Sequence, residues 1–155
     1  MEPQMEPLNV TIRELPPVQV AALEYNAEGL AGTYSESIGM LFREVEGWLR
    51  LRGYDTDALR RIGVPFVEGE MLRRYWCCIE APAGVTTDDG PVMLRQLAGG
   101  RYAVLTLPKD SATIGESIGR FHGEYVPANG LTIDATRSPY EVYYPDTMDY
   151  CTPIR

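Results

Sequence analysis

The chain has 155 residues, of which 45% are hydrophobic, so it can bury one good core but is too short for two independent cores. Its net charge of −8 comes from 22 acidic and 14 basic residues. A nucleic-acid-binding surface needs clustered lysine and arginine to neutralise phosphates, so this composition argues against direct nucleic-acid binding.

Four stretches in the first half have the alternating or apolar pattern of strands: residues 8–12, 18–25, 62–67 and 72–79. Residues 1–7 before them are expected to be a disordered tail. Pro16 and Pro17 separate the first two stretches, and Pro65 favours a sheet edge or a bulge because proline cannot donate to a ladder. After a predicted loop at residues 26–32, apolar side chains at helical spacing predict a helix over residues 34–53.

The second half follows a linker at residues 81–91 and repeats this pattern. Residues 92–97 and 101–107 are predicted to form a hairpin that turns at a glycine pair, Gly99 and Gly100. A shorter helix is expected over residues 114–125, followed by three extended stretches: residues 131–135, 138–145 and 149–154.

Three glycines of the second helix, Gly115, Gly119 and Gly123, share one helical face. Each costs about 1 kcal/mol relative to alanine in a helix. Either another backbone or a bound molecule approaches this face closely, or the helix is weak and depends on the packing of its apolar side.

A short motif occurs twice, at residues 33–39 and 113–119, with Thr, Glu, Ser, Ile and Gly in the same places eighty positions apart. In each copy the threonine hydroxyl and the glutamate can satisfy free amides at a helix start, as in a capping box. We interpret the chain as one domain, residues 8–155, made of two copies of one unit at about 8–80 and 91–155. Such halves leave a groove between them, and grooves bind ligands.

Candidate binding residues lie on two predicted strands. Period-two geometry places Glu141 and Tyr143 on one strand face. A carboxylate beside an aromatic ring suits an organic cation, although a surface salt bridge would give the same pattern. Trp76 is large and needs a partner for its ring N–H, so it lies either at a cavity wall or in the core.

The cysteine spacing predicts no metal or cofactor site, and the sequence predicts no membrane segment. Cys77 and Cys78 are adjacent and would point to opposite faces of a strand, and no Cys-x-x-Cys pair is present. No apolar run of about eighteen residues and no secretory leader is found. We therefore expect reduced thiols in a cytoplasmic protein that does not enter membranes.

Six segments follow one another in a recognisable order: residues 15–23, the helix at 34–53, residues 74–79, 99–104, 141–145 and 152–154. Together, from about Val10 to Ile154, they resemble the gyrase-inhibitor-like (GyrI-like) effector-binding family, which includes ligand-sensing domains of AraC-type and MerR-type multidrug regulators. The resemblance implies an α+β fold of duplicated β-α-β-β units, an antiparallel sheet with two helices on one face and a central ligand groove. It also implies that Glu141 lies at the groove floor and attracts cationic or amphipathic compounds.

The ligand-binding residues predicted on this basis are Glu141, Tyr143, Trp76, Tyr34, Tyr75 and Phe121. The leading hypothesis is a stand-alone small-molecule binding protein that sequesters or senses a cationic compound, rather than an enzyme. A second hypothesis, from family members that are hydrolases of cyclopropane-bearing genotoxins, makes Glu141 a general base. A third is a protein-binding inhibitor whose partner is a regulator or gyrase.

Overall fold

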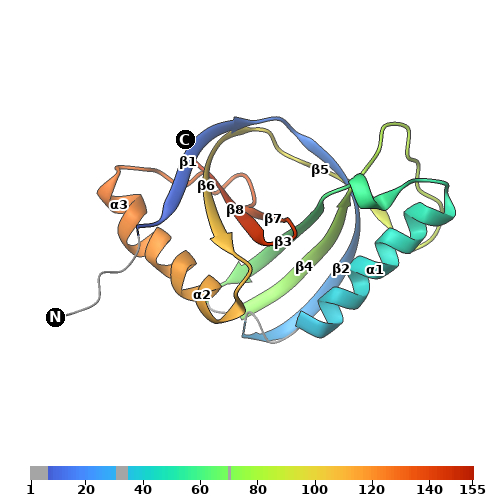
Figure 1. Cartoon of the computed structure of the whole chain (residues 1–155), viewed down its shortest axis with the longest axis horizontal. Helices are drawn as coiled ribbons and strands as arrows, with labels where there is room; N and C mark the ends of the chain where they lie inside the picture. Colours follow the sequence, from blue (N-terminus) through green and yellow to red (C-terminus); the bar gives the residue numbers. More distant parts are fainter. Residues whose placement is uncertain (1–6, 31–34, 70) are drawn as a thin grey trace.

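The computed structural model describes residues 7–30, 35–69 and 71–155, and its strands form one antiparallel sheet that curls on itself with the helices outside the curl (Figure 1). The strands are β1 (Asn9–Leu15), β2 (Val18–Leu30), β3 (Arg61–Glu68), β4 (Met71–Glu80), β5 (Met93–Leu97), β6 (Gly100–Pro108), β7 (Tyr140–Tyr143) and β8 (Thr147–Pro153). The helical segments are α1 (Ser35–Leu51), the short turn η1 (Thr56–Ala58), α2 (Ser111–Arg120), the π-helical η2 (Phe121–Tyr125) and α3 (Val126–Ala128). The predicted α+β class is confirmed.

The two edges of the sheet are joined along the chain, which curls the sheet on itself. The edge strand β1 continues into β2, next to the opposite edge, and the edge strand β5 continues into β6, next to the first edge. The strand order is β1-β6-β8-β7-β3-β4-β2-β5. β1 pairs with β6 and β2 pairs with β5, with Leu15 opposite Gly100 and Val18 opposite Leu97. The continuous segment β1–β2 therefore runs antiparallel to the continuous segment β5–β6, with β1 beside β6 and β2 beside β5. This brings both edges of the sheet together in Figure 1.

The predicted hairpin between residues 92–97 and 101–107 is wrong, because β5 and β6 pair with different strands. The glycine pair lets the chain pass close to the proline break instead of reversing. A β-carbon on Gly99 would lie 2.7 Å from Cδ of Pro17 and 2.9 Å from the carbonyl oxygen of Leu15. Gly100 has φ of 134°, which L side chains rarely adopt. The same residues that signal a turn here permit a close crossing.

The strand order has the same form from either edge. From one edge it is β1, β6, β8 and β7, and from the other it is β5, β2, β4 and β3. Along the chain, α1 lies between β2 and β3, and α2 lies between β6 and β7. Two copies of one β-α-β-β unit would give this correspondence, so it supports the predicted duplication, which stays a prediction.

The two faces of the sheet have different cores. Side chains such as Val20, Ile62 and Val104 pack together inside the curl. On the outer face, one cluster packs under α1 and another under α2 and η2. α1 buries Phe42, Val45 and Leu49 at the spacing of a helical stripe, as predicted. Both helices therefore cover the outer face, which leaves the strands between them as the floor of any site there.

The capping box predicted at Thr113 is wrong, because the helix does not begin there. Thr33, on which the other predicted capping box depends, lies outside the described residues. α2 begins at Ser111, so Thr113 is already inside the helix. The carbonyl of Asp110 accepts from the amides of Thr113 and Ile114, at 3.0 and 3.1 Å, which puts Asp110 in the cap position. The Thr113 hydroxyl donates to the same carbonyl at 3.2 Å. Ser111 and Ala112 tolerate helix, so the helix starts earlier than the motif indicates.

Two other boundaries also differ in an informative way. Residues 26–30, predicted as loop, continue β2, with a register shift between Asn26 and Gly29. Residues 131–135 contribute one isolated bridge, from Ile133 to Ile154. Pro65 behaves as predicted: the pairing of β3 with β7 stops at Gly63, so the edge that faces β7 is unpaired at the proline.

Candidate functional site

Glu141 lies on the short central strand β7, between the two halves of the sheet. It pairs with Gly63 of β3 on one side and with Tyr150 of β8 on the other. Its neighbours Tyr140 and Val142 are buried inside the curl, so Glu141 and Tyr143 face the helix side. Because cross-strand partners point to the same face, Tyr150 stands beside Glu141.

Two tyrosine hydroxyls converge on one oxygen of this carboxylate. Tyr75 and Tyr143 each donate to Oε1 of Glu141 at 2.8 Å, and the two hydroxyl oxygens are 3.1 Å apart. Burial, with help from the neighbouring carboxylate, raises the pKa of both tyrosines, so both remain protonated donors at neutral pH. The two donors hold the carboxylate in one orientation and leave Oε2 outside this network.

Burial raises the pKa of Glu141 itself above its usual value, and the two tyrosine hydrogen bonds oppose this shift. Among the described residues, no lysine, arginine or histidine lies within 4.0 Å of this carboxylate to form an ion pair. The carboxylate is therefore half-buried, hydrogen-bonded by neutral groups and without a positive partner from the described chain.

Gly63 makes this arrangement possible. The Tyr75 ring lies directly over it, and a β-carbon on Gly63 would sit 1.8 Å from the Tyr75 hydroxyl oxygen and 3.1 Å from Oε1 of Glu141. No side chain larger than hydrogen fits between them. Nothing in the local sequence signals this requirement, since it depends on β3 lying between β4 and β7.

Aromatic rings stand on both sides of Glu141. On the α1 side, Phe42 packs edge-on against Tyr75 and Tyr143, with ring centroids 6.4 and 6.1 Å apart. On the η2 side, the Tyr150 hydroxyl is 3.1 Å from Nε2 of His122. Phe42, Tyr150 and His122 are not among the site residues predicted from the sequence. The helical stripe identifies Phe42 only as core, and Tyr150 gains its place from pairing with Glu141.

The predicted site residues fall into three groups. Glu141, Tyr143 and Tyr75 come together as one hydrogen-bonded cluster. Phe121 is fully buried behind Tyr150, with ring centroids 6.3 Å apart, so it supports that side from within. Tyr34 lies outside the described residues.

Trp76 is not brought to Glu141. It is on the opposite face of β4 from Tyr75, packs edge-on against Phe66 with centroids 4.8 Å apart, and donates to Glu24 at 3.0 Å. The hydrogen-bond partner that its ring N–H requires is therefore Glu24, on the inner side of the sheet. An alternating strand can place only one of two adjacent aromatic residues on the Glu141 side.

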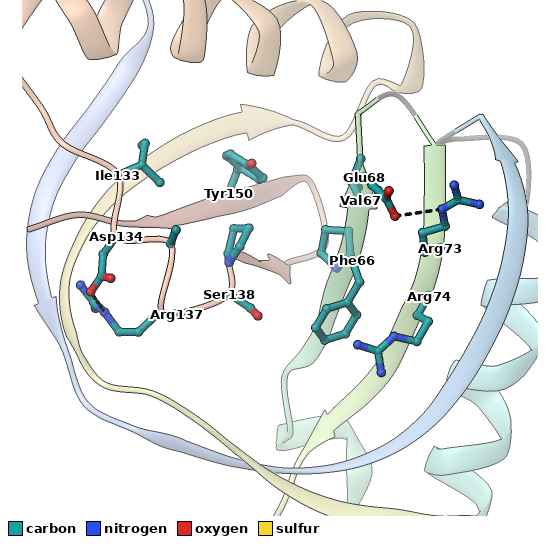
Figure 2. A pocket seen from close by; sticks show the side chains of 13 residues that line it. Phe66, Val67, Glu68, Arg73, Arg74, Ile133, Asp134, Arg137, Ser138 and Tyr150 are labelled. Carbon is teal, nitrogen blue, oxygen red and sulfur yellow. Dashed lines mark hydrogen bonds and ion pairs between the residues drawn. The ribbon is translucent and has the colours of Figure 1, made fainter.

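A cavity of about 640 Å³ opens where β3 and β7 separate, beyond the last pair, Gly63 and Glu141 (Figure 2). Its walls are the end of the β3–β4 hairpin and residues 133–139, and Tyr150 lines it. A second cavity of about 140 Å³ lies between β1 and the strands β6, β7 and β8. Neither cavity is lined by Glu141, Tyr75 or Tyr143, although Tyr150 links the larger one to Glu141.

The thiols and acidic groups do not form a second reactive centre in the described ranges. Cys77, Cys78 and Cys151 are buried and unpaired, and burial raises the pKa of Cys77 and of Cys151 to about 12. Such thiols are poor nucleophiles at neutral pH. Within residues 7–30, 35–69 and 71–155, no cluster of three or more His, Cys, Asp or Glu side chains could hold a metal ion. No helix of these ranges is long and apolar enough to cross a membrane.

Comparison with known proteins gave one family and several solved structures. A family model described as the GyrI-like small molecule binding domain matches residues 8–154. A cryo-EM structure of the EcmrR–DNA complex in EcmrR-RPo is similar with a TM-score of 0.73 and 11% identity, over 96% of this chain and 57% of that chain. The chain therefore spans little more than half of EcmrR. No curated protein matches it in sequence.

Two further structures are similar over nearly their full length. A hydrolase from Listeria innocua has a TM-score of 0.62 and 13% identity, over 94% of this chain and 91% of that chain. SAV2435 bound to tetraphenylphosphonium has a TM-score of 0.59 and 13% identity, over 95% and 94% of the two chains. At these identities the likeness shows a shared fold alone.

Proposed function

Because this chain belongs to the GyrI-like small-molecule binding domain family, we propose that it binds an organic cation through Glu141. The observation that carries the proposal is the half-buried carboxylate with two neutral donors on Oε1 and no basic partner among the described residues. A buried carboxylate is costly unless a positive charge or further donors compensate it. A ligand cation at Oε2 would supply that charge.

The surroundings of Glu141 favour an aromatic or otherwise apolar cation over a small inorganic one. Rings of Phe42, Tyr143 and Tyr150 stand around the carboxylate, and aromatic faces attract cations and offer apolar area. Tetraphenylphosphonium, which SAV2435 binds, has this chemistry and is a suitable probe.

Titration calorimetry with tetraphenylphosphonium tests the proposal. Glu141→Gln keeps an acceptor for the two tyrosines but removes the charge, and we expect affinity to fall by about 2–3 kcal/mol, roughly 30- to 150-fold. The matched control is Glu44→Gln, which neutralises an exposed carboxylate on α1 and should bind like the wild type. Equal affinity of the Glu141→Gln variant and the wild type would remove Glu141 from the site.

The finer roles predicted from the sequence stay predictions. Sequestration and transcription-linked sensing both require ligand binding at this site, and only sensing adds a response in a regulatory partner. Hydrolysis would use the same carboxylate as a general base. Similarity in fold to a hydrolase at 13% identity does not favour it over binding. Inhibition of a protein partner such as gyrase has no support in the described contacts.

A further inference from the structure

The larger cavity differs from the Glu141 site in its position and in its charge. Figure 2 shows its two walls, with Phe66 and Arg74 on the β3–β4 hairpin and Ile133, Asp134 and Arg137 on the segment opposite, where the side chains of Asp134 and Arg137 turn toward each other. Its volume of about 640 Å³ is in the range of small-molecule sites, roughly 300–1,000 Å³.

The lining of this cavity is positive in a negative protein. Three arginines and two carboxylates line it, a net charge of +1, whereas the whole chain has −8. Each arginine forms an ion pair: Arg73 with Glu68, Arg137 with Asp134, and Arg74 with Glu24, which lies outside the lining. Both carboxylate oxygens of Asp134 already accept hydrogen bonds from the protein. Oδ1 accepts from the amide and the hydroxyl of Thr136 at 3.0 and 2.6 Å, and Oδ2 accepts from Arg137 at 2.9 Å. These contacts lower the pKa of Asp134 to about 2. Asp134 is therefore a structural anion and not an anchor for a cation.

The other carboxylate, Glu68, pairs with Arg73 at 3.4 Å, and its side chain is 79% exposed. In Figure 2 this pair spans the end of the hairpin, away from the space between the walls. It therefore adds no negative charge to the centre of the cavity.

Arg74 is the arginine of the lining whose ion-pair partner, Glu24, lies outside the lining. Its guanidinium lies over the Phe66 ring, 4.4 Å from the centroid, and its Nη1 donates to Oε1 of Glu24 at 3.1 Å. Trp76 donates to the same oxygen at 3.0 Å, so the tryptophan helps to fix the carboxylate that orients Arg74. The contact with Glu24 uses one of the guanidinium nitrogens, and the planar fork suits a second carboxylate from a ligand.

The opposite wall offers a hydroxyl and apolar area. Figure 2 shows the Ser138 hydroxyl pointing into the space between the walls. Pro65 and Pro139 also line the cavity, next to Phe66 and Tyr150. A ring can lie against these side chains while a negative group reaches Arg74 and Ser138.

We propose that this cavity is a second ligand site, separate from Glu141, that takes an aromatic carboxylate. The carboxylate binds the Arg74 guanidinium and the Ser138 hydroxyl, and the ring packs between Phe66 and Pro139. The protein thus has two sites of opposite charge preference, which share Tyr150 as a border.

Titration calorimetry with 2-naphthoate, and with 2-naphthylmethylammonium as a cation of the same ring, tests the proposal. We expect Arg74→Gln to weaken 2-naphthoate binding about tenfold or more, because it removes a charge-assisted hydrogen bond. Ala135→Trp adds a large ring at an exposed position of the lining, leaves Arg74 unchanged in sequence and should abolish 2-naphthoate binding. Arg43→Gln, on the exposed side of α1, is the charge-matched control and should have no effect.

The Glu141→Gln variant separates the two sites. It should bind 2-naphthoate like the wild type, even if Glu141 proves not to bind cations. The proposal is overturned if 2-naphthoate does not bind at about 1 mM, if both Arg74→Gln and Ala135→Trp leave its affinity unchanged, or if Glu141→Gln removes it. Tighter binding of the ammonium than of the carboxylate in the Glu141→Gln variant would also overturn it.

Discussion

Replacing Gly63 by alanine should destabilise the protein strongly, because the Tyr75 ring occupies the place of the new methyl group. The added β-carbon would lie 1.8 Å from the Tyr75 hydroxyl oxygen and 2.5 Å from its Cζ. Tyr75 is 6% exposed and packs against Phe42, so the ring cannot swing away without a loss of packing.

The cost has two parts. Overpacking in a well-packed region costs about 1–3 kcal/mol. Displacing Tyr75 also breaks its hydrogen bond to the Glu141 carboxylate, which is worth about 1.5–3 kcal/mol for a charged acceptor. Partial relaxation makes the two less than additive, and we expect the free energy of unfolding to fall by about 3 kcal/mol.

Urea unfolding followed by tryptophan fluorescence measures this change as a lower midpoint with an unchanged slope. Gly47→Ala in α1 is the matched control: its β-carbon would meet nothing within 4 Å, so it should stabilise the helix by about 0.5–1 kcal/mol. In a Tyr75→Leu background, which lacks the clashing atoms, the cost of Gly63→Ala should fall below about 1 kcal/mol. If Gly63→Ala changes the free energy of unfolding of the wild type by less than about 0.5 kcal/mol, the clash with Tyr75 is refuted.

Three further predictions concern pH, thiol reactivity and the glycine stripe. Because burial raises the pKa of Glu141 above its usual value, tetraphenylphosphonium affinity should be full above that raised pKa and decline as pH falls through it. A calorimetric pH series measures this decline, which should be absent in Glu141→Gln. The buried thiols Cys77, Cys78 and Cys151 should not react with a disulfide reagent in the native protein at pH 8 and should all react in urea; rapid native labelling would contradict their burial. A β-carbon at Gly119 would meet nothing within 4 Å, so Gly119→Ala should raise stability by about 0.5–1 kcal/mol in urea unfolding, and a loss of ligand affinity instead would indicate that a bound molecule covers this face.

Local patterns predicted the elements well where one face of each is buried. The helical stripe of α1 and the alternation of β7 each reflect a boundary between core and surroundings, so the sequence alone places Phe42 in the core and Glu141 opposite Val142. End signals were weaker. The threonine motif misplaced the start of α2, because Asp110, which lies three residues before Thr113, is also able to cap a helix.

Pairing between distant strands was not readable from local pattern. The glycine pair at residues 99 and 100 has the composition of a turn, yet in the folded chain it passes the proline break between β1 and β2. Both outcomes need residues without side chains, so composition cannot distinguish them.

The sequence by itself determined the α+β class, the face of β7 that bears Glu141 and Tyr143, and a resemblance that membership of the GyrI-like family confirms. Only the tertiary structure decided that Tyr75, 66 positions before Glu141, donates to the same oxygen of Glu141 as Tyr143 does. It also decided that Gly63 makes room for that contact and that Trp76 lies on the opposite face of the sheet. The reason is that side-chain direction repeats along one strand, whereas the partner across a sheet depends on strand order and register, which arise when the whole chain packs.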